Sequence, residues 1–290
     1  MKGIILAGGL GSRLYPNTIA TSKQLLPIFD KPLIYYPLSV LMLAEINDIL
    51  IITNKRDIEA FEMLLGDGSD LGISISYISQ KNPNGIAEAF LVGEEFIGKE
   101  QVCLILGDNI FYGLGFSKQL LDTKKNLDGA TVFGYHVNDP KSFGVLEFDN
   151  QNNVINIEEK PKKPRSSFVV TGLYFYDNRV IDFAKELKPS DRGELEITDI
   201  NKKYLEANKL NVQILGRGFA WLDTGTHETL LTAGQFIHTI ENRQGLKVAC
   251  LEEIAFNNGW INLDVISKKI EFLNNSTYKD YLVSILNENK

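Results

Sequence analysis

Short apolar runs alternate with helical patterns through the first half of the chain, and this alternation is the strongest constraint on its fold. The runs predict strands at residues 4–6, 49–52, 73–77, 102–106 and 130–135. Apolar residues at helical spacing lie between them, in the sets Leu38, Leu41, Met42 and Ile46 (with Pro32 or Pro37 in a first-turn position) and Ile86, Ala87, Phe90 and Leu91. Buried strands separated by helices are typical of an α/β fold with a mostly parallel central sheet and helices on both faces.

After residue 140 the pattern changes to shorter strands, which are predicted at 144–148, 154–158 and 169–176. Two further helices are indicated by apolar stripes, one with Ile197, Ile200, Tyr204 and Leu205 and one with Leu230, Ala233, Ile237 and Ile240. The last segment is polar and helical, with the stripe Val265, Ile266, Ile270 and Leu273. No linker or repeat separates these parts. We therefore expect a core over residues 1–240 that includes the inserted strands, and a mainly helical C-terminal region over 241–290 packed on it.

Composition excludes several classes of protein. The 290 residues carry a net charge of -7, so the average surface repels phosphate backbones and we expect no nucleic-acid partner. The two cysteines, Cys103 and Cys250, are too few for a disulfide scaffold and fit a reducing compartment. No apolar run approaches the ~20 residues that span a bilayer, and the first apolar stretch is too short for a signal peptide. These features predict a cytoplasmic protein without a membrane partner.

The first predicted strand runs into a glycine loop at residues 6–14. Its glycines let backbone N–H groups approach a phosphate closely, and the guanidinium of Arg13 can bind two phosphate oxygens at once. A dinucleotide fingerprint needs a third glycine where Leu14 stands, so a dehydrogenase is a weak alternative. A phosphate-binding Walker loop needs Gly-Lys-Ser/Thr, which the chain lacks.

Two aspartates are candidates for a metal site. Asp108 follows the run 102–106 and so lies at the carboxyl end of a strand, where open α/β sheets bind their ligands. Asp223 precedes Thr226, which can cap the following helix and leaves the aspartate free for another task. A carboxylate beside a polyphosphate is repulsive unless a cation intervenes, and oxygen ligands suit Mg²⁺. The alternative for Asp108 is a helix or turn cap, and Trp221 nearby can equally be a core residue.

The string Glu158-Glu159-Lys160-Pro161 follows a predicted strand. A glutamate beside a lysine is usually a surface ion pair of small energy. In the alternative interpretation the carboxylate accepts hydrogen bonds from sugar hydroxyls while the ammonium neutralises a sugar phosphate. Alternation along 169–176 places one face toward such a ring, with the residues Val170, Gly172, Tyr174 and Tyr176.

The segment from Gly8 to Pro27 resembles the GGxGxRLxPxT…KxxxP string of sugar-phosphate nucleotidyltransferases, and the strings 158–161 and 192–199 resemble further strings of that family. The match extends from residue 1 to residue 262. The strings 107–113, 169–177, 220–226 and 244–250 are most similar to the members that use dTTP and α-D-glucose 1-phosphate. The resemblance implies a Rossmann-like nucleotidyltransferase fold, a homotetramer, and a place in making dTDP-sugars such as dTDP-rhamnose.

The resemblance also implies a role for each matching residue. Arg13 would hold the departing pyrophosphate, Lys23 would bridge the reacting phosphates and Lys160 would seat the sugar phosphate. Asp108 and Asp223 would bind Mg²⁺. The implied nucleotide-binding residues are Leu6, Gly8, Gly9, Gly11, Ser12, Arg13, Gln24, Gln80, Gly85 and Asp108. The implied sugar-phosphate residues are Asn109, Gly144, Glu159, Lys160, Val170, Tyr174, Arg192 and Trp221.

Among the positions that depart from the family pattern, two belong together. Leu114 and Asn257 stand where the family commonly has a histidine and an arginine, in a second nucleotide site through which dTDP-rhamnose inhibits. Our hypothesis is that this site persists but binds the inhibitor differently or poorly. Two other functions stay open: a related enzyme that uses UTP, CTP or ATP with another sugar phosphate, and a non-catalytic nucleotide-sugar-binding subunit. All five charged residues named for the chemistry are present, which argues against the subunit.

Overall fold

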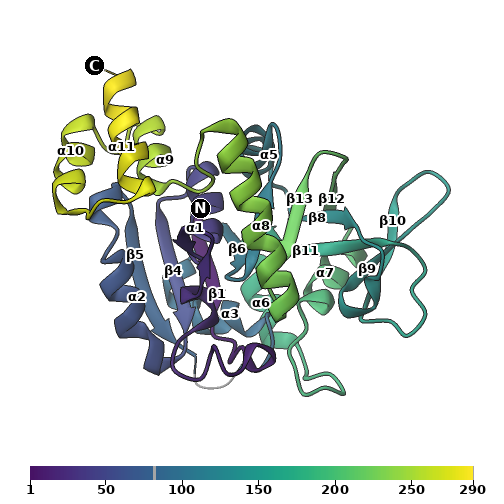
Figure 1. The fold of residues 1–290 in the computed structure, drawn as a ribbon. Coiled ribbons are helices and arrows are strands. Elements are labelled where there is room, and N and C mark those ends of the chain that lie inside the picture. Colours follow the sequence, from purple (N-terminus) through teal and green to yellow (C-terminus); the bar gives the residue numbers. More distant parts are fainter. Residues whose placement is uncertain (81–82, 290) are drawn as a thin grey trace.

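Four parallel strands form the centre of the molecule, as the sequence predicts (Figure 1). The computed structural model describes residues 1–80 and 83–289. In spatial order the four strands are β5 (Ser74–Ser79), β4 (Asp48–Thr53), β1 (Lys2–Ala7) and β6 (Val102–Leu106). Their carboxyl ends share one edge of the sheet, so residues after β1 and β6 meet there although they are about a hundred positions apart in the chain.

Helices cover both faces of these strands, because successive side chains along a strand point to opposite sides. Ile5 belongs to one hydrophobic core with residues of α1, α2 and α5, while Ile4 belongs to a second core with residues of α3, α4, α6 and α7. The helices are α1 (Tyr35–Leu43), α2 (Ile58–Leu65), α3 (Glu88–Val92), α4 (Glu94–Ile97), α5 (Phe116–Lys125), α6 (Arg179–Glu186) and α7 (Ile197–Glu206).

Two predicted helices are shorter than their apolar patterns. α3 begins at Glu88, after Ile86 and Ala87. α1 ends at Leu43, so Ile46 lies beyond it, although Ile46 is buried in the same core. The chain turns out of the helix at Glu45, whose backbone has a φ of 52°. Pro37 rather than Pro32 occupies the first turn of this helix, since Pro32 belongs to the two-residue strand β3 (Lys31–Pro32), which pairs with β2 (Pro27–Ile28).

The second half extends the sheet mainly with antiparallel strands. β11 (Phe168–Tyr176) pairs antiparallel on one side with β6 and, at Val169, with β9 (Gly144–Phe148), and on its other side with β8 (Ala130–His136). β10 (Val154–Glu159) pairs antiparallel with β9, and β12 (Leu210–Leu215) pairs parallel with β8. The pairing of β11 with β8 is interrupted between Val170 and Tyr174. β6 and β9 contact different parts of β11, and Thr171 and Gly172, which lie between those parts, line an opening.

Two short strands that the sequence pattern did not indicate form a separate antiparallel pair. They are β7 (Asn109–Tyr112) and β13 (Ala220–Asp223). Their register sets Asp223 opposite Asn109 and therefore next to Asp108, which lies two residues after the end of β6. This pairing joins parts of the chain more than a hundred residues apart.

The last three helices lie at one end of the molecule and the β9–β10 hairpin at the other (Figure 1). They are α9 (Leu251–Asn257), α10 (Leu263–Phe272) and α11 (Thr277–Glu288), and α8 (His227–Gln244), which precedes them, runs through the middle of the view. α8 crosses the proposed boundary at residue 240. In the predicted stripe of the tail, Ile266 is buried and Ile270 and Leu273 pack around it, whereas Leu273 itself lies just beyond the end of α10. No described helix is long and apolar enough to cross a membrane.

Buried charges connect this region to the N-terminal part. The Lys31 ammonium, only 1% exposed, contacts Asp30 at 2.5 Å and Glu241 at 2.8 Å. Lys247 contacts the same two carboxylates. The four side chains form a charge-neutral group, which we call the ion quartet, in which each buried charge has partners.

Candidate functional site

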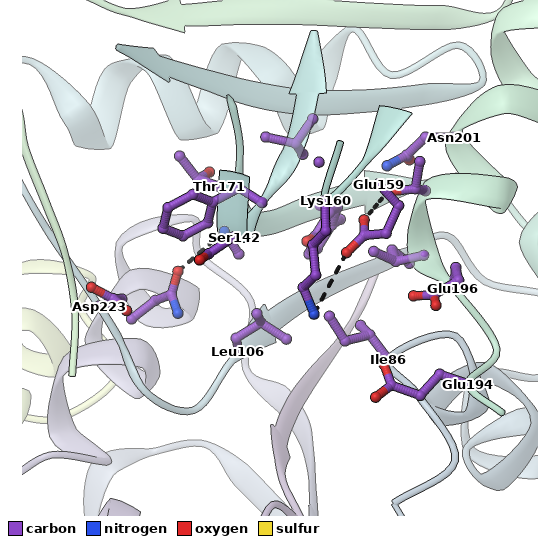
Figure 2. A pocket seen from close by; sticks show the side chains of 18 of the residues that line it. Ile86, Leu106, Ser142, Glu159, Lys160, Thr171, Glu194, Glu196, Asn201 and Asp223 are labelled. Atoms are coloured by element: carbon purple, nitrogen blue, oxygen red, sulfur yellow. Dashed lines mark hydrogen bonds and ion pairs between the residues drawn. The ribbon is translucent and has the colours of Figure 1, made fainter. Parts of the chain in front are cut away.

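A cavity of about 250 Å³, here called the central cavity, opens where β6, β9, β10 and β11 meet β13 and the start of α7. Eleven of the residues singled out from the sequence line it: Arg13, Asp108, Asn109, Gly144, Glu159, Lys160, Val170, Tyr174, Arg192, Trp221 and Asp223. Figure 2 shows Asp223 on one side of this cavity and Glu159 on the other, with Lys160 between them. Residues from five distant parts of the chain therefore share one space.

Asp108 and Asp223 form an acidic pair at one side of the cavity. Burial raises the pKa of Asp223, and the negative charge of Asp108 raises it further. For Asp108 burial also acts to raise the pKa, but the Lys23 ammonium at 2.6 Å outweighs it and the net pKa is lowered. Asp108 is consequently ionised. A cation bound beside Asp223 would offset the burial and the repulsion that disfavour its ionised form.

The two cations on this side come from the N-terminal segment, Arg13 from the glycine loop and Lys23 from a later turn. Lys23 lies in a 3₁₀ turn at Lys23–Leu25, is buried, and donates to Asp108 Oδ2. Arg13 lines the cavity near Asp223: a Cβ placed on Gly225 would lie 3.1 Å from the Arg13 guanidinium and 3.2 Å from Asp223 Oδ2. A side chain at position 225 would therefore crowd both groups.

Asn109 organises the centre of the cavity. Its Oδ1 accepts hydrogen bonds from Trp221 Nε1 at 2.7 Å and from the Gly172 backbone N–H at 3.1 Å. Its Nδ2 donates to Asp108 Oδ1 at 2.8 Å. Trp221 packs edge-on against Phe143, so the indole is both core and cavity wall, and the two interpretations of this residue are compatible.

Glu159 lies on the opposite side, among several donors. Its Oε2 accepts from Thr198 Oγ1 at 2.5 Å, while its Oε1 lies 3.8 Å from Lys160 Nζ and 3.6 Å from Arg192. Lys160 adopts a left-handed backbone with a φ of 43° and its side chain is 41% exposed. The ammonium therefore remains accessible to an anion that enters the cavity.

Arg192, expected to bind the sugar phosphate, already contacts carboxylates of the protein. Its guanidinium contacts Glu196 at 2.8 Å and Glu194 at 3.1 Å in addition to Glu159, and the hydrogen bond to Glu196 is the main cause that raises its pKa. In this arrangement its charge is already shared among three carboxylates.

The other predicted nucleotide-binding residues do not line the central cavity: Leu6, Gly8, Gly9, Gly11, Ser12, Gln24, Gln80 and Gly85. Gln80 lines a separate space of about 540 Å³, the loop cavity, together with Leu10, Asn54, Lys55, Arg56 and Ser79. Gln24 is buried against the strand ends, where it accepts from Ser22 Oγ at 2.7 Å.

Two of the predicted nucleotide-binding glycines, Gly8 and Gly85, have close neighbours that a side chain would meet. A Cβ on Gly8 would lie 2.4 Å from Gln80 Oε1, and a Cβ on Gly85 would lie 2.3 Å from the Leu195 carbonyl oxygen. Gly85 also has a φ of 112°, which side-chain-bearing residues rarely adopt. The side-chain amide of Gln80 donates to Glu88 Oε2 at 2.5 Å, so its Oε1 is left to face Gly8. Residues 81 and 82, between these positions, lie outside the described residues.

A family model described as "Nucleotidyl transferase" matches residues 2–240. The chain belongs to this family. It is 59% identical to a glucose-1-phosphate thymidylyltransferase from Neisseria gonorrhoeae over 99% of both chains. Among solved structures, one assigned as a glucose-1-phosphate thymidylyltransferase from Bacillus anthracis is 45% identical, with a TM-score of 0.75 over 81% of this chain and 94% of that one. A UDP-glucose pyrophosphorylase complexed with UDP-glucose, at 24% identity, shares the fold with a TM-score of 0.72 over 82% of this chain and 98% of that one.

These similarities confirm the family, the fold and the enzyme class expected from the glycine-loop and EEKP strings. The chain is a nucleotidyl transferase. The relatives' names also agree with the subset of the family that the sequence resembles.

The acidic pair of this nucleotidyl transferase fits a magnesium ion. No group of three or more His, Cys, Asp or Glu side chains suited to a metal occurs among residues 1–80 and 83–289. Mg²⁺, however, is commonly held by one or two carboxylates together with substrate phosphates and waters. The mutual repulsion that raises the pKa of Asp223 is what a bound divalent cation would relieve.

Several cavity residues were not identified from the sequence. They include Ser142, Thr171, Glu194, Glu196, Thr198 and Asn201. One signal was available for Asn201, because it is a polar residue on the apolar stripe of α7, between Ile197 and Tyr204. Thr171 gave no such signal, since its place at the cavity depends on the gap between β6 and β9 along β11.

Proposed function

We propose that this protein transfers the thymidylyl group of dTTP to α-D-glucose 1-phosphate, giving dTDP-glucose and pyrophosphate. The observation that carries the proposal is the central cavity. Arg13, Lys160, Asp108 and Asp223 all line it, and Lys23 contacts Asp108. The naming of relatives at up to 59% identity supports the choice of substrates. The product is the first intermediate of dTDP-sugar biosynthesis, such as that of dTDP-rhamnose.

The reaction needs no general base. An oxygen of the sugar phosphate is already an anionic nucleophile, which attacks the α-phosphorus of dTTP, and the bond from that phosphorus to the bridging oxygen of pyrophosphate breaks. The barrier comes from bringing two polyanions together in line. The protein as a whole is acidic, with a net charge of -7, so cations must be concentrated at the point of reaction.

Each cation has a place in this scheme. Lys160, exposed beside Glu159, seats the incoming sugar phosphate. Arg13 stabilises the negative charge that grows on pyrophosphate, because a guanidinium can bind two of its oxygens. Lys23, held by Asp108, lies between the two phosphates that react.

Asp108 and Asp223 would hold Mg²⁺, which when bound supplies charge neutralisation and orientation at the α-phosphate. The hydrogen bonds from Lys23 and Asn109 fix the orientation of the Asp108 carboxylate in advance. The register of β7 and β13 fixes the position of Asp223 in the same way.

For the nucleotide, we propose that the backbone of Gly8, Gly9, Gly11 and Ser12 surrounds the phosphates, with Leu6 and Gln24 behind them. The free Oε1 of Gln80 is an acceptor for the N3–H of thymine, and the Gly85 N–H is a donor for its O4. Uracil offers the same two groups, so some use of UTP is expected, whereas cytosine presents the reverse pattern and is rejected.

For the sugar phosphate, we propose that Glu159 and Asn109 bind hydroxyl groups while Arg192 assists at the phosphate. Gly144, Val170, Tyr174 and Trp221 would provide the walls around the ring. A glycine at 144 suits this purpose, because a Cβ there would lie 3.0 Å from Thr198 Oγ1 and 3.4 Å from Glu159 Oε2.

The deciding experiment measures pyrophosphate release from dTTP, UTP, CTP and ATP, each with α-D-glucose 1-phosphate, with and without Mg²⁺. We expect release with dTTP, less with UTP, and none after chelation. Faster release with another nucleotide or another sugar phosphate would favour a related transferase. If none of these pairs reacts, a non-catalytic nucleotide-sugar-binding subunit becomes the better account. We also propose a homotetramer working in the cytoplasm, which the solution mass and cell fractionation would test.

A further inference from the structure

Two buried polar atoms of the central cavity, Asn201 Nδ2 and Thr171 Oγ1, have no hydrogen-bond partner in the described part of the chain. Both residues are completely buried. A buried N–H without a partner is costly and therefore uncommon in folded proteins. An unpaired donor on a cavity wall indicates that a ligand completes it.

The amide of Asn201 is the more informative of the two, because its direction is fixed. The hydroxyl of Tyr176 donates to Asn201 Oδ1 at 2.5 Å. Burial raises the pKa of Tyr176 well above its ordinary value, so the phenol keeps the proton that it donates. With its oxygen engaged, the planar amide turns its two N–H groups away from Tyr176. The Thr171 hydroxyl, in contrast, can rotate.

The surroundings of Asn201 match a sugar edge. Figure 2 shows Asn201 beside Glu159 on one side of the cavity. Thr198, which precedes Asn201 on α7, donates to Glu159, so this wall combines a carboxylate acceptor with an unused amide donor. Neighbouring hydroxyls of a sugar ring are each donor and acceptor, and together they satisfy both.

We propose that Asn201 is a sugar-selecting residue, whose Nδ2 donates to the oxygen of one ring hydroxyl next to the hydroxyl that donates to Glu159. Tyr176 is the positioning residue that aims the amide. This inference rests on the proposed function, since it assumes that a sugar phosphate occupies the central cavity.

The test compares wild-type enzyme with Asn201→Leu, using dTTP, Mg²⁺ and five acceptors: α-D-glucose 1-phosphate and its 2-, 3-, 4- and 6-deoxy analogues. Wild type should show kcat/KM about tenfold lower for the analogue that lacks the hydroxyl read by Asn201. Asn201→Leu should lose about tenfold with the parent sugar, be unchanged with that analogue, and keep wild-type discrimination against the others. The KM for dTTP should not change.

The proposal is overturned if Asn201→Leu keeps the wild-type discrimination against all four analogues, or if the KM for dTTP rises as much as that for the sugar. Asn201→Asp, which keeps the size and the acceptor for Tyr176, replaces the leucine variant if that one does not fold, with the same expected loss of discrimination. Tyr176→Phe should weaken discrimination against the same analogue by a smaller factor.

Asn211→Leu, on the exposed side of β12, is the matched control and should leave all five values at wild type. The two failures are distinguishable. A wild type that releases no pyrophosphate with dTTP contradicts the proposed function, whereas an active wild type with an indistinguishable Asn201→Leu contradicts only the role of Asn201.

Discussion

The two sides of the site are built on different principles. The glycine-loop side, from Leu6 to Pro27, is one continuous segment of loops and short turns that carries the exposed Arg13 and the buried Lys23. The sugar side, around Glu159, collects buried side chains from β9, β10, β11, α7 and β13, already joined by hydrogen bonds and ion pairs. A half made by one continuous segment suits a polyphosphate, whose charges backbone N–H groups and cations can bind, whereas a wall of side chains already held in place suits a rigid ring whose hydroxyls must be told apart.

The Asp108–Asp223 pair lies between the two sides, so its loss should affect the reaction as a whole and not one substrate. Asp223→Ala should lower kcat by about 100-fold or more, because the cation proposed to act at the α-phosphate would lose one of its two carboxylate ligands. The variant should remain folded. Steady-state rates at saturating Mg²⁺ with both substrates measure the effect, and Asp122→Ala, on the exposed face of α5, is the matched control. Near-normal turnover of Asp223→Ala would remove it from the metal site.

Lys160 should affect the sugar side selectively. Lys160→Ala should reduce kcat/KM for α-D-glucose 1-phosphate by about 100-fold, since a phosphate loses its charge-assisted partner. The KM for dTTP should change little. Lys163→Ala, in the same exposed loop, serves as the control. An equal loss with both substrates would show that Lys160 does not belong to one side only.

Gly8 should affect the nucleotide side selectively. In Gly8→Ala the new methyl group would lie 2.4 Å from Gln80 Oε1, and the flexible glutamine would turn away. We expect about a tenfold higher KM for dTTP, with the KM for the sugar phosphate retained. Gly216→Ala, where a Cβ meets no atom within 4 Å, is the control. Unchanged dTTP binding in Gly8→Ala would argue against a base contact by Gln80.

The acidic pair should also cost stability. A carboxyl group whose pKa is raised by folding destabilises the native state above that pKa, and the penalty disappears below the pKa of the unfolded chain. Burial and Asp108 raise the pKa of Asp223 in this way. Asp223→Asn without metal should therefore raise the melting temperature at pH 7 by roughly 2 °C, with the difference vanishing near pH 3. A lower melting temperature at pH 7 would contradict this.

The smallest effect is expected at the second nucleotide site that the resemblance implies. With Leu114 and Asn257 at the departing positions, dTDP-rhamnose should inhibit weakly. Asn257→Arg should strengthen inhibition a few-fold, because a guanidinium can pair with a diphosphate. An inhibitor titration of both forms measures this. Tight inhibition of the wild type would refute the hypothesis.

The same contrast explains what the sequence could predict. The strands that end in the glycine loop and Asp108 are continuous apolar runs, and their motifs are contiguous, so both the strands and these site residues were accessible. The position of Asp223 depends on pairing between β7 and β13, which are only four residues each and carry no clear period. Thr171 and Asn201 enter the cavity through long-range packing. Ile46 matches the helical spacing of α1, but the chain leaves the helix before it and turns at Glu45, so the pattern predicted too long a helix.

The ion quartet has a consequence for how the chain is made. Lys31 and Asp30 emerge from the ribosome some two hundred residues before Glu241 and Lys247. Until that late segment arrives, the early hairpin lacks two of the four charges that make its burial tolerable. The N-terminal region therefore completes its native packing only near the end of synthesis. In a nascent chain stalled before residue 241, the Lys31 ammonium should be exposed to solvent and react with an amine-labelling reagent. In the full-length chain it should be protected.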